Sequence, residues 1–212
     1  MIPAFSCVMK DEVNILDICY GLGFNTLATL QYVQKKFPNK KINVYSPELD
    51  VSLVKSLKYF TYPKEFDAYK NIILALSKNG VYKDENIYIE IFLGDAREYI
   101  KNFTNKFDIV YQDAFSPSSN PLLWTKEYFL DIKKAMKSSG VLTTYSIALR
   151  TRLALYENDF NVYLNTGEEF RDATIASLKT LDGFEAVKME HKISCNPQVK
   201  SLRDKELGVD YT

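Results

Sequence analysis

The fold is decided by the stretch DICYGLGFN, residues 17–25. A short apolar run containing Val13, Ile15 and Leu16 precedes it, and a helix-like pattern follows it. A strand, a tight glycine turn and a helix N-terminus in this order open the nucleotide-type cofactor sites of doubly wound α/β folds. Gly21 and Gly23 lack a Cβ, so the backbone can turn sharply there and a ligand can approach it closely.

Strand-like and helix-like segments alternate along the rest of the chain, which predicts an α/β domain with a mostly parallel sheet covered by helices. The predicted strands are 13–18, 41–46, 86–93, 107–112, 140–146, 160–164 and 172–178. The predicted helices are 24–37, 50–59, 65–79, 95–102, 125–138, with Gly140 at its end, and one from about 149. We expect one domain over residues 1–212, in which about 195–212 form a surface arm.

Composition restricts the class of function. The chain has 27 basic and 27 acidic residues and a net charge of zero, which argues against a strongly electrostatic nucleic-acid binder, although a local basic face fits within a neutral total. The three cysteines form no CxxC pair and no metal-like cluster, and a single histidine, His191, excludes a mechanism that needs a histidine pair. With no membrane-length apolar run and no signal-peptide pattern, the sequence favours a reduced, cytoplasmic location.

An acidic residue ends each of the first four predicted strands. They are Asp17, Glu48, Asp95 and Asp113. In an open parallel sheet the ligand lies outside the carboxyl ends of the strands, so these carboxylates decide the chemistry of the site.

Two of these acids are candidates for cofactor contacts. Glu48 lies at the tip of the second strand, where a carboxylate can accept hydrogen bonds from both hydroxyls of a ribose. The alternative is that Glu48 or Asp50 caps the following helix. Asp95 can accept a hydrogen bond from an adenine amino group or act as the N-cap of helix 95–102, and the sequence leaves both open.

The glycine turn departs from the GxGxxG pattern of NAD sites. Cys19 stands at the first glycine position and Thr26 at the third. S-adenosylmethionine-dependent methyltransferases tolerate this variation, because their cofactor has no pyrophosphate to hold at the helix N-terminus. The chain also lacks a GxxxxGK[ST] motif, so phosphate-loop chemistry is not supported.

The segment FDIVYQDAFSP, residues 107–117, is followed by NPLLW at 120–124. A buried strand delivers Asp113 to the sheet edge, and a proline-stiffened loop places Phe115 beside it. Methyl transfer to an amine on a planar base needs such a pair: the carboxylate accepts hydrogen bonds from the amine, and the ring stacks on the base. Alternatively, Phe115 and Trp124 are core aromatics and Asp113 caps a turn.

These motifs resemble the methyltransferase domain of the MnmC-type enzymes, which make 5-methylaminomethyl-2-thiouridine at the tRNA wobble position. The resemblance covers about residues 13–160. DAFSPSSNPLLWT at 113–125 is similar to the family's Asp-Gly-Phe-x-Pro-x-x-Asn-Pro-x-x-Trp signature, GLGFN at 21–25 to its cofactor turn, and SPE at 46–48 to its second-strand acid. It implies a Rossmann-like class I methyltransferase fold, with a mostly parallel seven-stranded sheet, a terminal antiparallel pair and helices on both faces.

The resemblance also implies roles for residues. The catalytic candidates are Asp113 and Phe115. The candidates for binding S-adenosylmethionine are Asp17, Gly21, Gly23, Asn25, Glu48, Asp95 and Ala96. The expected reaction converts 5-aminomethyl(-2-thio)uridine to 5-methylaminomethyl(-2-thio)uridine in tRNA. We expect a stand-alone methyltransferase without the flavin oxidase domain, a metal or a membrane partner, and the oligomeric state stays open.

A tRNA substrate requires phosphate contacts. The candidates are late basic residues, and for each of them an ordinary solvated surface charge is the simpler interpretation: Arg150, Arg152, Lys188, Lys192, Lys200, Arg203 and Lys205.

Two other functions remain open at this point. A spermidine-synthase-like aminopropyltransferase shares the sheet, the second-strand acid and an Asp on the fourth strand, and it would use decarboxylated S-adenosylmethionine. A non-catalytic interaction module is the other, supported by Cys19 and by the short segment before the first strand. The cofactor that stabilises the protein in a melting assay discriminates among the three.

Overall fold

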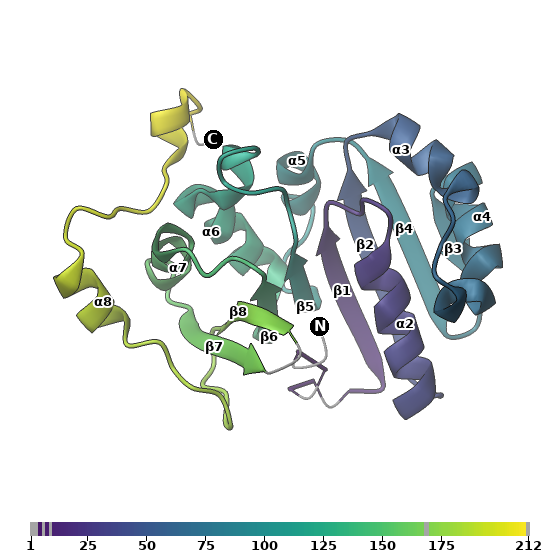
Figure 1. The fold of residues 1–212 in the computed structure, drawn as a ribbon, viewed down its shortest axis with the longest axis horizontal. Coiled ribbons are helices and arrows are strands. Elements are labelled where there is room, and N and C mark those ends of the chain that lie inside the picture. The colour runs from purple at the N-terminus through teal and green to yellow at the C-terminus, as the bar shows by residue number, and fades with distance from the viewer. Residues whose placement is uncertain (1–3, 6, 9, 168–169, 211–212) are drawn as a thin grey trace.

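The computed structural model describes residues 4–5, 7–8, 10–167 and 170–210. Its centre is an eight-stranded sheet of order β3-β4-β2-β1-β5-β6-β8-β7 (Figure 1). The strands are β1 (Glu12–Ile18), β2 (Lys41–Glu48), β3 (Val81–Lys83), β4 (Ile87–Leu93), β5 (Phe107–Gln112), β6 (Met136–Thr144), β7 (Asn161–Gly167) and β8 (Phe170–Ser177).

The central strands β4, β2, β1, β5 and β6 are parallel, and β8 and β7 add an antiparallel pair at one end. This confirms the predicted fold class. The prediction of seven strands misses β3, which pairs antiparallel with β4 at the other edge. Three residues are too short to show a strand's alternation in sequence.

Helices cover both faces of the sheet, as predicted. They are α2 (Phe24–Lys36), α3 (Val51–Ser56), α4 (Lys70–Asn79), α5 (Ala96–Ile100), α6 (Lys126–Ala135), α7 (Leu149–Tyr156) and α8 (Met189–Cys195). Short 3-10 helices are η1 (Leu57–Tyr59), η2 (Lys64–Tyr69), η3 (Pro121–Trp124) and η4 (Asp204–Leu207).

Two hydrophobic clusters lie on opposite sides of the sheet because side chains alternate along each strand. Val13 and Ile15 of β1 belong to the cluster that α2 and α4 cover, whereas Leu16 and Ile18 belong to the cluster under α5, α6 and α7. Because helices cover both faces, the central strand β5 is buried at every position.

Several predicted boundaries shift, and two helices illustrate this. The helix expected at 65–79 begins as the 3-10 helix η2 and becomes α-helical only at Lys70. The helix expected at 125–138 ends at Ala135, and Gly140 lies inside β6 rather than at a helix end. β6 begins early because Met136 pairs with Phe107 before an irregularity in the β5–β6 register.

The segment after α8, predicted to form a surface arm, is anchored to the domain (Figure 1, yellow). Ser201 and Asp204 are buried, and Asp204 forms an ion pair with Arg97 of α5. The backbone N–H of Lys126 donates to the carbonyl of Leu202 at 2.8 Å. Such contacts between distant parts of the chain leave no periodic pattern in the sequence.

Candidate active site

The carboxyl ends of the parallel strands surround a cavity of about 680 Å³. It lies at the point where the strand order reverses, since β2 and β5 pair with β1 on its two opposite sides. Ligands of open α/β sheets bind at this switch point. The cavity is within the range of about 300–1,000 Å³ that small-molecule and cofactor pockets occupy.

The turn after β1 forms one wall of the cavity. Cys19, Gly21 and Gly23 all have left-handed backbone conformations, with φ of 63°, 57° and 76°. At Gly23 an added Cβ would also lie 2.5 Å from the hydroxyl oxygen of Tyr20, so any side chain clashes there. Gly21 lines the cavity, whereas Gly23 does not. Gly23 therefore shapes the turn, and the backbone at Gly21 is exposed to a ligand.

Glu48 ties this turn to the tip of β2. Its Oε2 accepts a hydrogen bond from the backbone N–H of Gly21, and its Oε1 accepts one from the N–H of Asp50, both at 2.9 Å. Each carboxylate oxygen can accept a second hydrogen bond, so the side chain, which lines the cavity, can still bind hydroxyl groups. Its structural bonds fix the orientation in which it would do so.

Two further acidic residues that line the cavity also act as N-caps of helices. The Oδ1 of Asp50 accepts from the N–H of Leu53, which makes Asp50 the N-cap of α3. The Oδ1 of Asp95 accepts from the N–H groups of Arg97 and Glu98, which makes it the N-cap of α5. Its Oδ2 has no hydrogen-bond partner among the residues the structure describes. The two roles left open for Asp95 are therefore compatible, because capping uses only one oxygen.

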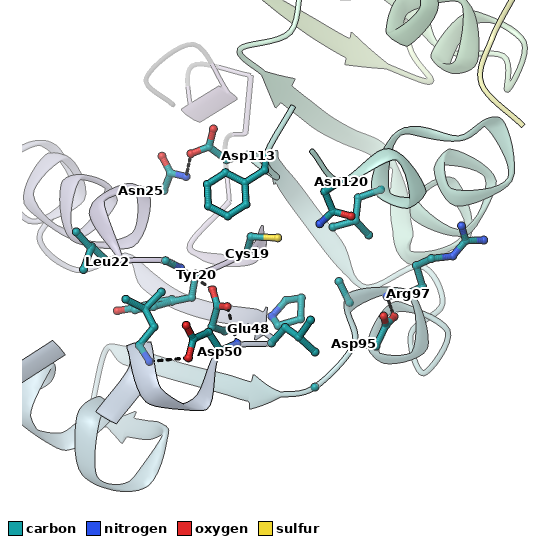
Figure 2. Close-up of a pocket in the computed structure, with 18 of the residues that line it drawn as sticks. Cys19, Tyr20, Leu22, Asn25, Glu48, Asp50, Asp95, Arg97, Asp113 and Asn120 are labelled. Atoms are coloured by element: carbon teal, nitrogen blue, oxygen red, sulfur yellow. Dashed lines mark hydrogen bonds between the residues drawn. The ribbon is translucent and has the colours of Figure 1, made fainter. Parts of the chain in front are cut away.

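Asn25 joins two carboxylates at one end of the cavity, and Figure 2 shows its hydrogen bond to Asp113. Its Nδ2 donates to Oδ2 of Asp113 at 2.9 Å and to Oδ1 of Asp17 at 3.3 Å. Thr26 donates its hydroxyl to Oδ2 of Asp17 at 2.9 Å. Asp113 is exposed and lines the cavity, whereas Asp17 is 1% exposed and lies beneath it. Asp17 thus acts on the site through Asn25.

Burial determines the protonation of these groups. It raises the pKa of Asp17 to about 7, and the nearby charge of Asp113 adds to the increase, while the hydrogen bonds from Thr26 and Asn25 oppose it. Desolvation also raises the pKa of Asp113, although the Asn25 hydrogen bond opposes that change. The pKa of the Cys19 thiol is raised to about 12 by burial and by the charge of Glu48, so it remains protonated near neutrality.

The two aromatic residues of the loop after β5, Phe115 and Trp124, have different surroundings. Trp124 is 1% exposed and belongs to the core, and its Nε1 donates to the carbonyl of Phe115 at 2.7 Å. Phe115 is 77% exposed and lines the cavity, so it is not a core residue. Gln112 further fixes the loop by donating to the carbonyl of Leu123 at 2.8 Å. The ring of Phe115 is therefore presented on a rigid backbone.

Arg97 was not among the sequence candidates, although it lines the cavity opposite Asn25 (Figure 2). Besides its ion pair with Asp204, its Nη1 donates to the carbonyl of Leu122 at 3.0 Å. The pKa of Asp204 is held below its ordinary value because the hydrogen bonds from Arg97 and Thr125 outweigh the effect of burial. Arg97 is thus neutralised and fastens the C-terminal segment and the loop after β5 to the cavity wall.

The structure brings most predicted site residues together. Those that line the cavity are Gly21, Asn25, Glu48, Asp95, Ala96, Asp113 and Phe115. Sequence reasoning did not select several other lining residues: Cys19, Tyr20, Leu22, Phe24, Pro47, Leu49, Asp50, Leu53, Gly94, Arg97, Asn120, Leu122 and Leu123. Asn120 could have been selected, because it belongs to the NPLLW motif.

The late basic residues have mixed surroundings. Arg152 is buried and its Nε donates to Thr174 at 3.0 Å. Arg203 donates to Glu127 at 2.7 Å, and Arg150 donates to the carbonyl of Lys200 at 3.0 Å. All three arginines make internal contacts, although Arg150 is exposed, and their role in binding phosphates stays a prediction.

Neither a metal site nor a membrane span is found in the part of the chain that the structure describes. Its His, Cys, Asp and Glu side chains form no group of three or more that could hold a metal ion. None of its helices combines the length and the apolar character that crossing a membrane requires.

Comparison with protein families gives a match over residues 64–179, to a family described as S-adenosyl-L-methionine-dependent methyltransferase. An uncharacterized protein of Methanocaldococcus jannaschii is 34% identical over 150 residues, covering 69% of this chain and 41% of that protein. The bifunctional tRNA 5-methylaminomethyl-2-thiouridine biosynthesis protein MnmC of Leptospira interrogans is 25% identical over 179 residues, covering 75% and 26%. The chain thus spans less than half the length of either relative.

Among solved structures, MnmC2 from Aquifex aeolicus superimposes with a TM-score of 0.77 at 25% identity, covering 98% of this chain and 67% of that one. Spermidine synthase from Thermotoga maritima gives a TM-score of 0.53 at 18% identity, over 100% of this chain and 68% of that one. The second likeness concerns the fold alone.

Proposed function

Because this chain belongs to the family of S-adenosyl-L-methionine-dependent methyltransferases, we propose that it methylates the aminomethyl nitrogen of 5-aminomethyl(-2-thio)uridine at the wobble position of tRNA. The product is 5-methylaminomethyl(-2-thio)uridine. The relatives named for tRNA 5-methylaminomethyl-2-thiouridine biosynthesis support this substrate. A tRNA substrate implies a cytoplasmic enzyme.

The residues around the cavity fit the cofactor. When bound, S-adenosyl-L-methionine supplies an electrophilic methyl group on a sulfonium sulfur. The remaining acceptor positions of Glu48 suit ribose hydroxyls, and the open Oδ2 of Asp95 suits the amino group of adenine. The backbone at Gly21, which carries no Cβ, permits close approach of the cofactor.

The observation that carries the proposal is the placement of Asp113. Its Oδ2 is held by Asn25 at 2.9 Å, and the carboxylate lines the cavity beside the exposed ring of Phe115. Asp113 can therefore accept a hydrogen bond from the substrate amine while Phe115 stacks on the uracil ring. This orients the nitrogen lone pair toward the incoming methyl group.

Asp113 can also accept the proton that the substrate nitrogen loses in the reaction. As the N–C bond forms and the S–C bond breaks, the nitrogen must lose one proton. The pKa of Asp113 is above that of an ordinary carboxyl because of desolvation, so Asp113 is a better base than a solvated aspartate. The proton passes to the carboxylate and then to solvent, which Asp113 contacts directly.

A two-part experiment tests the proposal. Calorimetric titration compares S-adenosylmethionine with its decarboxylated analogue, and hypomodified tRNA is then incubated with enzyme and cofactor and digested to nucleosides for mass spectrometry. We expect preferential binding of S-adenosylmethionine and conversion of 5-aminomethyluridine to its N-methyl derivative. Preference for the analogue would point to aminopropyl transfer, and the absence of modified nucleoside would refute the tRNA reaction.

A further inference from the structure

One stretch of the chain is basic although the protein as a whole is neutral. Residues 51–64, with sequence VSLVKSLKYFTYPK, contain three lysines and no acid, in a chain of 27 basic and 27 acidic residues. The lysines are Lys55, Lys58 and Lys64, all exposed. None of the three forms a salt bridge within the described part of the chain. Acids return only at Glu65 and Asp67, and Asp67 is paired with Lys70 at 2.9 Å.

Exposed aromatic rings accompany these lysines. Tyr59 is 78% exposed, and Phe60 and Phe24 are each 41% exposed. The Nζ of Lys58 lies 4.9 Å from the ring centroid of Tyr59. A cation over a largely solvated ring provides both a positive charge and a flat apolar surface at one place.

The rings of Phe24, Phe60 and Tyr62 are held by packing against one another. Phe24 and Phe60 meet edge to face at 6.2 Å between centroids, and Phe60 meets Tyr62 at 4.9 Å. Tyr62 donates its hydroxyl to the carbonyl of Leu22 at 3.0 Å, and buried Phe66 lies 6.0 Å from Phe24. This fixes the segment to the glycine turn of the cavity.

The surface is continuous with the cavity. Phe24 belongs both to the aromatic group and to the cavity lining, as the first residue of α2. Leu49, which is 72% exposed, and Leu53 of α3 extend the lining toward residues 55–60. A ligand longer than one nucleoside that leaves the cavity on this side therefore meets the lysines and rings.

We propose that Phe24, Lys58, Tyr59, Phe60 and Tyr62, called here the basic–aromatic patch, bind the nucleotides that flank the methylated nucleoside in the RNA. The inference rests on the proposed function, since it concerns the same substrate. Aromatic side chains stack on unpaired bases of any sequence, and lysines contact the phosphates between them. Single-stranded RNA in a loop displays both groups.

The charge around the cavity favours a separate surface for phosphate contacts. The cavity wall carries Glu48, Asp50, Asp95 and Asp113, and its one lining arginine, Arg97, is paired with Asp204. Phosphates near the mouth are therefore repelled by the wall and attracted only by neighbouring cations. Lys58 of the basic–aromatic patch, together with exposed Lys55 and Lys64, supplies such cations, whereas Arg152 and Arg203 make internal contacts.

The test uses Lys58→Ala, Tyr59→Ala and the double variant in the full chain. Both side chains are exposed, so the variants should melt as the wild type does. We expect each single variant to raise the KM for hypomodified tRNA roughly tenfold, from the loss of one stacked base or one phosphate contact. The dissociation constant for S-adenosylmethionine and the nucleoside modified should not change.

A matched control lies at the other end of α2. There the Nζ of Lys40 lies 4.8 Å from the ring centroid of Phe37, roughly 20 Å from the cavity end of the helix. The double variant Phe37→Ala, Lys40→Ala removes the same kind of cation–ring pair. We expect this control variant to leave the KM for tRNA within about twofold of the wild type. Of the two single patch variants, only Lys58→Ala should reduce the salt dependence of RNA binding, because it alone removes a charge.

The outcomes separate the two proposals. If wild type methylates tRNA but the patch variants keep its KM, or the control variant loses as much, the basic–aromatic patch is not an RNA-binding surface. Sedimentation that shows a dimer dissociated by Tyr59→Ala would assign the patch to a second copy and overturn the inference as well. If wild type neither binds nor methylates tRNA, the proposed function fails, and the patch loses its ligand with it.

Discussion

The buried carboxyl of Asp17 should make the stability of the protein fall as the pH rises through neutrality. Its pKa is about 7 in the folded protein and 3.8 ordinarily. At a pH between these two pKa values, Asp17 is protonated in the folded state but ionised in the unfolded state. The free energy of unfolding therefore decreases with rising pH, and the stabilisation is fully present below about pH 4 and lost above about pH 7.

The size of this effect follows from the difference in pKa. A difference of about three pH units corresponds to about 4 kcal/mol of unfolding free energy. Asp17→Asn removes the titration but keeps the hydrogen bonds, since its carbonyl can accept from Asn25 and its amide can donate to Thr26. We expect the variant to match wild type near pH 4 and to exceed it by up to about 4 kcal/mol at pH 8.

Urea unfolding of wild type and Asp17→Asn at pH 4, 6 and 8 measures the difference in their free energies of unfolding. The contributions of the other titratable groups cancel in this difference, because the two proteins share them. Asp108→Asn provides the opposite case. Burial opposes ionisation of Asp108, but hydrogen bonds from Lys10 and Lys137 outweigh it and hold its pKa below the ordinary value. The advantage of wild type over Asp108→Asn should therefore shrink as the pH falls. A difference between wild type and Asp17→Asn that does not change with pH would refute the reasoning.

Three other predictions follow from the site. Asn25→Ala should lower the methyl-transfer rate at saturating substrates about tenfold, because Asp113 loses its positioning bond, and an effect confined to cofactor affinity would instead make Asn25 a cofactor ligand. Glu48→Ala should weaken S-adenosylmethionine binding roughly tenfold or more in calorimetry, and unchanged affinity would exclude its ribose role. Gly21→Ala and Gly23→Ala should each cost about 1–2 kcal/mol in urea unfolding, with Gly23→Ala the worse because of its clash, and equal losses would contradict that ranking.

Much of the fold could be predicted because local signals and topology agree. The run before Gly21 and the strand 107–112 are both rich in apolar residues, and Asp17 and Asp113 lie at their carboxyl ends. Since parallel strands end at the same sheet edge, Glu48, Asp95 and Asp113 had to converge whatever the packing details. The sequence therefore predicted, without any contact being known, the sheet edge at which the cavity lies.

The remaining features depend on contacts between distant residues. Nothing near Asn25 in sequence indicates that its amide joins Asp17 to Asp113, 88 residues away from it. The pairing of Arg97 with Asp204 spans 107 residues, and it fastens an apparently polar tail to a residue that lines the cavity. Short-range patterns carry no information on such pairs.

The different burial of Phe115 and Trp124 could also be seen only in the structure. Both are aromatics in one loop, and only the fold shows that Trp124 fills the core while its Nε1 holds the backbone of Phe115. The sequence left both assignments open because residue type does not determine burial within a loop.

The most direct test of the central claim is the single-turnover rate of methyl transfer to hypomodified tRNA, for wild type and Asp113→Ala at saturating S-adenosylmethionine. Calorimetry confirms beforehand that the variant binds the cofactor as wild type does. We predict that Asp113→Ala loses a factor of about 10² or more in the rate, because the amine loses its orienting and proton-accepting group. A variant that transfers methyl groups at nearly the wild-type rate would contradict the role assigned to Asp113.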